Sequence, residues 1–477
     1  MPQNRRIYLL DPKKLSPETI AVTFAKTSRS PLPFDAIAEE LSDASAADFH
    51  EKWVVGYGHS SVAEHAVLHI AVENISRLAV ECLESNRLAS YTEKSSRYQV
   101  WDSDHFAIPP EFQQGPTFEI YSGTCTKLFE AYGHAFTLIS RQMEKDVERN
   151  PGESEKGFQT RIHSACADVC RYFLPAGSLA NVGLSINARA LEHAISKMLS
   201  HPLREVQDIG QEIKENALKH VPTLVKYANK TPYLSSLNDV QPLNKSAEVQ
   251  ADGEIADWCT CIDHDADGEQ KILAALLYRQ GYSSMQDALM AISALDARGK
   301  LELADRLTEK MDRHDIPCRE FELGQATFDL LLDQGAYFEL KRHRMMTQIV
   351  QPFTPKHGYA LPKMIETAGL GDLFCEMMEE ARETYETLAE TNVHAAAYVL
   401  PNAFNRRVLL QMNLRSAIHL IKLRCAENAH FAIRRPTLRM AEMLAERFPL
   451  FNGLLSACST ETWKTVEKEF FMETQKF

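Results

Sequence analysis

The chain has 477 residues, a formal net charge of −13, and hydrophobic and charged fractions of 44% and 25%. That length favours two domains over a single core, and the acidic balance argues against a general nucleic-acid or membrane-surface binder, which needs a basic face. No apolar run is long enough to span a bilayer, and the N-terminal stretch lacks the apolar core of a secretory signal. Ten scattered cysteines are typical of buried free thiols in a reducing compartment, so we expect a cytoplasmic protein.

Apolar periodicity predicts a chain made mostly of helices, with a strand near the front. The predicted elements are, in chain order, two helices within 17–50, a strand at Leu68–Val72, and helices at Ile75–Leu83, 117–150, 160–174 and 184–221. Residues 229–269 differ, because they are rich in Pro, Asn, Asp, Ser and Gly and show few periodic apolar positions. That composition predicts a linker that leads into a second domain.

The second half of the chain repeats the order of motifs found in the first. Leu174-Pro175 recurs as Leu400-Pro401, and Asn187-Ala188-Arg189 recurs as Asn413-Leu414-Arg415. Matching order across two halves of similar length indicates a tandem duplication, in which one fold is used twice. We therefore expect a pseudo-symmetric pair of repeats, at 1–228 and 270–477, on either side of the linker.

A short polar segment, Glu81–Tyr98, combines arginines, a carboxylate and several hydroxyls. Arginine offers a planar fork to phosphate, and hydroxyls supply neutral donors and acceptors beside it. This mixture suits a polyanionic ligand such as a nucleotide. The alternative is a solvated helix end followed by a polar turn.

The motifs resemble those of the flavin-dependent thymidylate synthases, a class unrelated to the cysteine-dependent enzyme. That family carries Arg-His-Arg and, further on, Glu-x-Ser-x-Arg-Tyr; here Arg342-His343-Arg344 matches the first motif and Glu93–Tyr98 the second. Further family positions are matched by His59, Ser61, Glu64, His65, Arg171, Leu174, Pro175, Asn187, Arg189, Asn413, Arg415, Leu423 and Arg424. The resemblance implies an α+β fold, two tandem copies of a small antiparallel sheet flanked by long helices.

The two repeats have lost complementary parts of the family pattern. The first repeat lacks the Arg-His of the triplet and has Met198 where the last family arginine falls. The second lacks Glu-x-Ser-x-Arg and has Ala397 opposite Arg171 and Arg319 opposite Glu64. Members of the family are homotetramers whose active sites are shared between subunits. The resemblance therefore implies that a homodimer of this chain imitates the tetramer, with sites built from both repeats and half as many of them as in the family tetramer.

The resemblance also implies a reaction and a set of residues. The family transfers a carbon from methylenetetrahydrofolate to C5 of dUMP, with electrons passing from NADPH through FAD, and needs neither a cysteine nucleophile nor a metal. The implied catalytic and substrate-binding residues are Arg97, Arg171 and Arg424, with Glu93 and Ser95 also on the substrate. The implied flavin-binding residues are Ser28, His59, Ser61, Glu64, Arg87, Asn187, Arg189, His193, Arg342, His343, Arg344, Asn413, Arg415 and His419.

Alternatives remain open for several of these residues. Arg189 and Arg415 also fit surface ion pairs, His59 a helix cap, and the Arg342 triplet a basic helix terminus. For the whole chain, the alternatives are a non-catalytic flavin- or nucleotide-binding protein and a flavin-dependent alkylation of another pyrimidine nucleotide. Cys259-x-Cys261-x-x-His264 lacks a fourth zinc ligand at a known spacing, so it is interpreted as linker and the entry into a strand.

Overall fold

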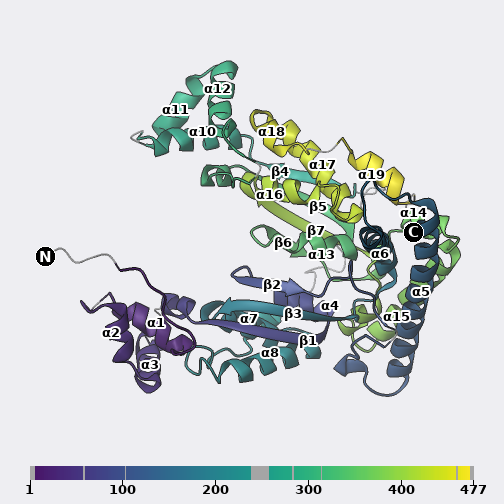
Figure 1. Ribbon diagram of the computed structural model, residues 1–477, viewed down its shortest axis with the longest axis horizontal. Helices are drawn as coiled ribbons and strands as arrows, with labels where there is room; N and C mark the ends of the chain where they lie inside the picture. Colours follow the sequence, from purple (N-terminus) through teal and green to yellow (C-terminus); the bar gives the residue numbers. More distant parts are fainter. Residues whose placement is uncertain are drawn as a thin grey trace, which may run out of the picture.

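The computed structural model describes residues 6–28, 30–56, 60–102, 104–237, 257–281, 284–312, 314–457 and 460–472. Within these ranges the chain forms two arms, each built on one antiparallel sheet (Figure 1). Helices α5 (Pro116–Asp146), α6 (Glu155–Cys170) and α15 (Gly371–Ala389) lie where the two arms meet (Figure 1).

The first repeat runs in the order three helices, a strand, a helix, a strand, two long helices, a strand and further helices. Its strands are β1 (Val67–Ser76), β2 (Ala89–Glu93) and β3 (Leu179–Asn187). Its remaining α-helices are α1 (Pro17–Lys26), α2 (Phe34–Glu39), α3 (Asp43–Phe49), α4 (Arg77–Glu84), α7 (Ala188–Leu199), α8 (Arg204–Ala217) and α9 (Pro232–Ser236). A π-helix (His50–Gly56) and the 3-10 helices Ser60–His65, Pro110–Phe112 and Arg171–Phe173 complete it.

The second repeat has the same order with one additional edge strand. Its strands are β4 (Cys259–His264), β5 (Gln325–Asp333), β6 (Thr347–Val350) and β7 (Asn405–Asn413). Its remaining α-helices are α10 (Gly268–Arg279), α11 (Met285–Ala294), α12 (Ala297–Thr308), α13 (Gln334–Leu340), α14 (Lys363–Thr367), α16 (Leu414–Arg424), α17 (Phe431–Arg447), α18 (Asn452–Leu455) and α19 (Trp463–Phe470). Its 3-10 helices are Arg319–Leu323, Pro355–His357, Ala395–Val399 and Pro449–Phe451.

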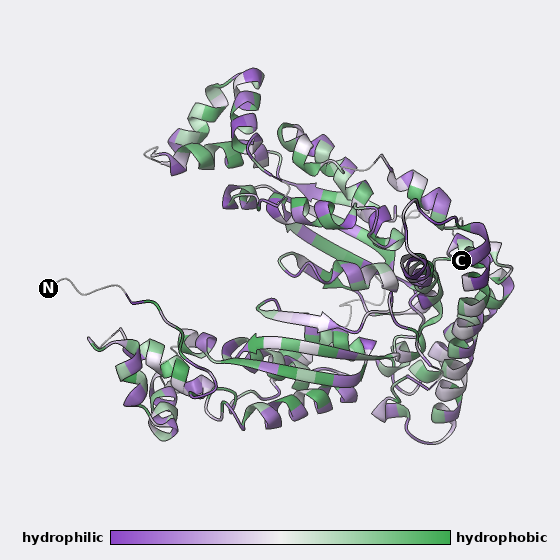
Figure 2. Cartoon of the chain, viewed as in Figure 1, coloured by the Kyte–Doolittle hydropathy of each residue, from purple (hydrophilic) through white to green (hydrophobic). Residues whose placement is uncertain are grey.

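The sheets share one topology, with strand order β1-β3-β2 in the first repeat and β4-β5-β7-β6 in the second. Their registers also correspond, because Val67 pairs with Asn187 and Gln325 pairs with Asn413. Buried and less buried residues alternate along much of β3 and β7, as expected for strands that present one face to a core. Figure 2 shows the apolar residues gathered along these strands. The α+β fold with two repeats is therefore confirmed.

Several local predictions need correction. The 184–221 segment does not begin as a helix: its first residues end β3, so Asn187 and Asn413 terminate strands instead of lying within helices. The 17–50 segment forms three α-helices where two were predicted. The predicted linker contains α9 and β4, while its central part, 238–256, lies outside the described residues.

Local geometry also corrects the pairing of Arg319 with Glu64. The N–H of Ala188 donates to the carbonyl of Ala66 at 2.8 Å, and that of Leu414 donates to Gly324 at 2.9 Å. These contacts are equivalent, so Ala66 corresponds to Gly324. Glu64 lies two residues before Ala66 and Glu322 lies two residues before Gly324, so the two glutamates correspond. The second repeat has kept this glutamate, and Arg319 is a neighbouring residue without that role.

The repeats meet across a pseudo-twofold axis, and equivalent backbone groups exchange hydrogen bonds there. Pro175 and Pro401 form an antiparallel bridge. The N–H of Asn402 donates to the carbonyl of Leu174 at 3.0 Å, and the N–H of Ala176 donates to that of Leu400 at 2.9 Å. Such reciprocity is the signature of an isologous interface, here formed within one chain.

Two equivalent arginines also exchange hydrogen bonds between the halves, further along the interface. Arg87 donates from Nη2 to the carbonyl of Met346 at 3.1 Å, and Arg344 donates from Nη2 to that of Ala89 at 2.7 Å. Arg344 also lies over the Tyr91 ring, 4.9 Å from its centroid. The interface therefore brings the Arg-His-Arg segment of the second repeat against β2 of the first.

Candidate functional site

The carboxylate of Glu93, at the end of β2, lies at the junction of the two repeats. Its side chain is only 2% exposed. Arg77 of the first repeat places Nη1 3.1 Å from Oε1, while Arg342 and Lys341 of the second place nitrogens 3.6 and 4.0 Å from Oε2. Burial alone would raise the pKa of Glu93, but the neighbouring cations outweigh it and hold that pKa below its usual range. Glu93 is therefore ionised.

Arg97 lies in the turn after β2, four residues beyond Glu93. Its Nε and Nη2 donate to the two carboxylate oxygens of Asp168 on α6, at 2.7 and 2.8 Å. Nη2 also approaches the carbonyl of Asn428 at 3.4 Å, and the Arg97 N–H donates to Ser95 Oγ at 3.3 Å. A bidentate pair of this kind fixes the plane of the guanidinium, so Asp168 orients Arg97.

Arg171 extends from the first repeat into the second. It is 2% exposed, and its Nη2 donates to the carbonyl of Gly335 at the start of α13, at 3.3 Å. Asn402, also from the second repeat, donates from Nδ2 to the Arg171 carbonyl at 2.9 Å. The buried Nε of Arg171 has no hydrogen-bond partner among the described residues, which leaves one donor of this guanidinium available.

Arg424, at the end of α16, contacts two groups of its own repeat. Its Nη1 donates to Glu339 Oε2 at 2.8 Å, and its Nε donates to His343 Nε2 at 3.0 Å. Because Nε2 accepts this bond, His343 is neutral. Burial, with Arg424 nearby, lowers the pKa of His343 to about 3. Glu339 stays ionised, since Arg342, Arg171 and Arg424 outweigh its burial and lower its pKa.

Together these groups form what we call the cationic cluster. Its members are Arg77, Arg97, Arg171, Lys341, Arg342 and Arg424, with the carboxylates Glu84, Glu93, Asp168 and Glu339. Six cations face four carboxylates, and both repeats contribute each sign of charge. The excess of two positive charges matches the dianion of a phosphate monoester.

Other predicted flavin-binding residues lie apart from the cationic cluster. Asn187 and Asn413 cap α7 and α16, each accepting a backbone N–H at 2.9 Å. Arg189 pairs with Glu64, and Arg415 pairs with Glu322 at 2.6 Å. The arginine contacts match the alternative of surface ion pairs for Arg189 and Arg415, while Asn187 and Asn413 act as helix N-caps.

The remaining predicted residues divide into near and distant ones. Ser28, Ser61 and His193 are exposed, and Ser28 Oγ donates to the carbonyl of Ala25. His419 lies beside the cluster, its ring 5.7 Å from that of His343. His59 lies outside the described residues.

Five cluster members were not predicted from the sequence: Arg77, Glu84, Asp168, Glu339 and Lys341. Asp168 precedes Arg171 by three residues at the end of α6, a spacing that places both on one side of the turn, and this signal could have found it. Lys341 adjoins the Arg342 triplet. Arg77 and Glu339 carry no comparable signal. Arg77 reaches Glu93 through the fold of the first repeat, and Glu339 lies near Arg171 because the two repeats meet there.

Two kinds of feature are absent from the described residues. Across the described ranges, no group of three or more His, Cys, Asp or Glu side chains is arranged to hold a metal ion. In the same ranges, no helix combines the length and apolar character needed to cross a membrane.

Fold and site define a two-repeat α+β protein with one cationic cluster built from both repeats. The chain belongs to the thymidylate synthase complementing protein family, whose model matches residues 10–223 and 260–450. A UPF0159 protein of Chlamydia muridarum is 28% identical over 444 residues, covering 88% of this chain and 84% of that protein. A UPF0159 protein of Thermoplasma acidophilum is 25% identical over 454 residues, covering 88% and 90%.

Shorter relatives match about the length of one repeat. A flavin-dependent thymidylate synthase of Clostridium tetani is 26% identical over 216 residues, covering 45% of this chain and 82% of that protein. Among solved structures, the flavin-dependent thymidylate synthase ThyX of Helicobacter pylori, complexed with FAD and dUMP, is 19% identical. It aligns with a TM-score of 0.28, covering 45% of this chain and 96% of that one.

Proposed function

We propose that the chain is an FAD-dependent thymidylate synthase. It would methylate dUMP at C5 to give dTMP, taking the carbon from methylenetetrahydrofolate and electrons from NADPH. The observation that carries this proposal is the meeting of Glu93 in the first repeat with Arg342 in the second, inside a cluster with two excess positive charges. The names of the single-repeat relatives support the same reaction.

In this proposal the cationic cluster binds the nucleotide. Arg97, Arg171 and Arg424 would contact the phosphate and the uracil carbonyls, where negative charge develops as C5 reacts. Ser95 and Glu93 would orient the nucleotide by hydrogen bonds. The free Nε donor of Arg171 fits this role, because a buried donor without a partner is costly unless a ligand satisfies it.

Flavin would be held by the Arg342-His343-Arg344 segment and supplies the redox chemistry when bound. The donors present fit an anionic cofactor: the Arg342 side chain is 44% exposed, and Arg344 Nε is buried without a hydrogen-bond partner among the described residues. His343 is neutral and adds no charge. We also propose, from the resemblance, that the chain works as a cytoplasmic homodimer.

A second candidate is a non-catalytic nucleotide- or flavin-binding protein. The observation that favours it is that two of the arginines already bind carboxylates of the chain itself. Arg97 donates from Nε and Nη2 to Asp168, and Arg424 donates from Nη1 to Glu339. A substrate phosphate would compete with these carboxylates. This candidate predicts flavin or nucleotide binding without turnover.

Complementation of a thymidine-requiring strain separates the two candidates. The unaltered chain should restore growth without thymidine, and Arg97→Ala should abolish the rescue. Arg161→Ala is the matched control, because Arg161 makes the same two-bond contact with Glu153, at 3.0 and 2.8 Å, outside the cluster. Purified protein that binds flavin and dUMP but forms no dTMP would favour the non-catalytic candidate; full rescue by Arg97→Ala would refute the site.

A further inference from the structure

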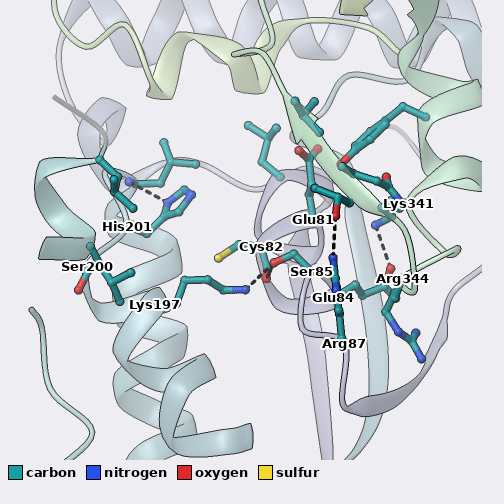
Figure 3. Close-up of a pocket in the computed structure, with 18 of the residues that line it drawn as sticks. Glu81, Cys82, Glu84, Ser85, Arg87, Lys197, Ser200, His201, Lys341 and Arg344 are labelled. Atoms are coloured by element: carbon teal, nitrogen blue, oxygen red, sulfur yellow. Dashed lines mark hydrogen bonds and ion pairs between the residues drawn. The ribbon is translucent and has the colours of Figure 1, made fainter. Parts of the chain in front are cut away.

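A pocket of about 560 Å³ (Figure 3) is lined by residues equivalent to members of the cationic cluster, among them Ser85 and Val350, the counterparts of Arg342 and Glu93. Its walls come from α4, α7, α9 and the segment around β6. The volume falls within the range of small-molecule sites. Because the axis relates the two repeats, this pocket occupies the position equivalent to the cluster.

The equivalent residues have lost the chemistry of the cluster. Aligned through β3 and β7, Arg171 corresponds to Ala397 and Arg424 to Met198. Aligned through α4 and α13, Glu93 corresponds to Val350, which lines the pocket. The groups assigned to a nucleotide phosphate are therefore absent from this side, and the pocket is not a second copy of the same site.

The pocket nevertheless has unmatched positive charge. Its two carboxylates are already paired: Glu81 with Arg406 at 2.8 Å and Glu84 with Lys341 at 2.9 Å. Lys197, Arg87 and Arg344 also line it, and none of the three makes an ion pair within the described residues. A site with three cations free of carboxylate partners favours an anion.

Lys197 is the best placed of these cations. It is half-buried, and Nζ donates to Ser85 Oγ at 2.5 Å (Figure 3). Nζ also donates to Asn86 Oδ1 at 2.8 Å. Both partners are neutral, so the ammonium charge is left without compensation. Burial lowers the pKa of Lys197, which is the expected effect on a cation that lacks an anionic neighbour.

His201 supplies a neutral donor on the same wall. Its Nδ1 accepts the Leu203 N–H at 3.2 Å, so the ring proton is on Nε2 (Figure 3). Burial lowers the pKa of His201 to about 4. The Nε2–H group has no hydrogen-bond partner among the described residues, which leaves it available to a ligand oxygen.

The rest of the lining is largely apolar. It includes Leu78, Leu203, Leu234, Leu237 and Tyr337. Such walls suit an aliphatic chain or an aromatic ring, and they disfavour a strongly hydrated group. A free phosphate or a nucleotide would leave much of this surface uncovered.

We propose that this pocket is a second ligand site, and that it binds an amphipathic organic anion, with a carboxylate or sulfonate at Lys197 and His201 and an apolar body against the leucines. The site differs from the proposed nucleotide site, since its lining contains none of Arg97, Arg171 or Arg424, although Arg344 of the proposed flavin-binding segment also lines it. The two sites share Lys341, which pairs with Glu84 of the pocket and lies 4.0 Å from Glu93 of the cluster.

The test uses the fluorescence of 8-anilinonaphthalene-1-sulfonate with the full chain. We expect saturable binding that octanoate displaces, while inorganic phosphate and dUMP do not. The neutral analogue N-phenyl-1-naphthylamine should bind at least about tenfold more weakly, because it lacks the anionic group.

Variants assign the binding to the pocket. Lys197→Met should weaken dye binding about tenfold, and Leu237→Trp should fill the cavity from an exposed position and block the dye without disturbing the core. Lys219→Met is the matched control, because Lys219 also donates to a neutral amide, Asn216, but lies outside the pocket. Unchanged binding in both pocket variants, an equal loss in the control, or displacement by dUMP would overturn the proposal.

Discussion

Lys341 Nζ lies 2.9 Å from Glu84 Oε2, and these two residues occupy equivalent positions in the two repeats. In an exact duplicate the same residue would face itself across the axis. Divergence has placed opposite charges there, so the contact is an ion pair, with side chains only 6% and 8% exposed. The pair is available only when both repeats are present in one chain and have diverged differently.

Removing one member of this pair should be strongly destabilising. Lys341→Met leaves the carboxylates of Glu84 and Glu93 without a shared cation, and we expect a loss of about 3–5 kcal/mol in the free energy of unfolding. The double variant Glu84→Met/Lys341→Met should lose less than Lys341→Met alone, because it removes one uncompensated charge. Urea unfolding measures both.

Lys127→Met is the control for that experiment. Lys127 pairs with Glu380 at 2.8 Å, close to the 2.9 Å of the axis pair, but its side chain is 56% exposed. An exposed pair contributes about 1 kcal/mol or less. A Lys341→Met variant no less stable than Lys127→Met would contradict a structural role for the axis pair.

Glu339→Gln should strengthen nucleotide binding. The change removes a negative charge from the cationic cluster while keeping an acceptor for Arg424. We expect dUMP to bind about tenfold more tightly, since one less carboxylate competes with the phosphate. Calorimetric titration at two salt concentrations measures the affinity and its electrostatic share. Glu322→Gln, which alters an arginine-paired carboxylate outside the cluster, should change nothing, and weaker binding in Glu339→Gln would mean that Glu339 positions Arg424.

His343 should make the fold sensitive to acid. Its folded-state pKa of about 3 lies below the ordinary value of 6.5, so the unfolded chain binds the proton more readily. The stabilisation from keeping the ring neutral is fully present above about pH 6.5 and is lost as the pH falls toward 3. The loss in the free energy of unfolding is about 2–3 kcal/mol at pH 4.5. His343→Gln keeps an acceptor for Arg424 and should flatten the fall in Tm between pH 7 and 4.5. The exposed His134→Gln should not, and an identical Tm profile for both variants would exclude this role.

Flavin should bind with a stoichiometry near one per chain. The Arg-His-Arg segment is complete only in the second repeat, where Arg342 lies against Glu93, whereas Ser85 and Asn86 stand in the equivalent positions of the first. Flavin absorbance against protein concentration at saturation gives the ratio. Arg342→Ala should weaken flavin binding about tenfold, and the exposed Arg319→Ala provides the control. Two flavins per chain would show that the diverged side still binds the cofactor.

The sequence predicts secondary structure well over long segments with periodic apolar residues and poorly at the junctions between strands and helices. The helices α5 and α6 were expected within a few residues. The end of β3, from Leu184 on, was predicted as helix because Leu184 and Ile186 lie directly before the strongly helical α7, and a short apolar run does not distinguish the two states. Pairing with β1 and β2 on both sides decides in favour of a strand.

The sequence alone determined that the chain is duplicated and that the repeats have lost complementary motifs, because order and residue identity are recorded along the chain. Only the tertiary structure decided which partners meet. Arg171 of the first repeat enters the second at Gly335, Glu93 faces Arg342, and Asp168 takes both donors of one edge of Arg97. The physical reason is that a buried charge needs a partner close in space. Those partners come from distant parts of the chain, some of them from the other repeat, so the local sequence does not determine them.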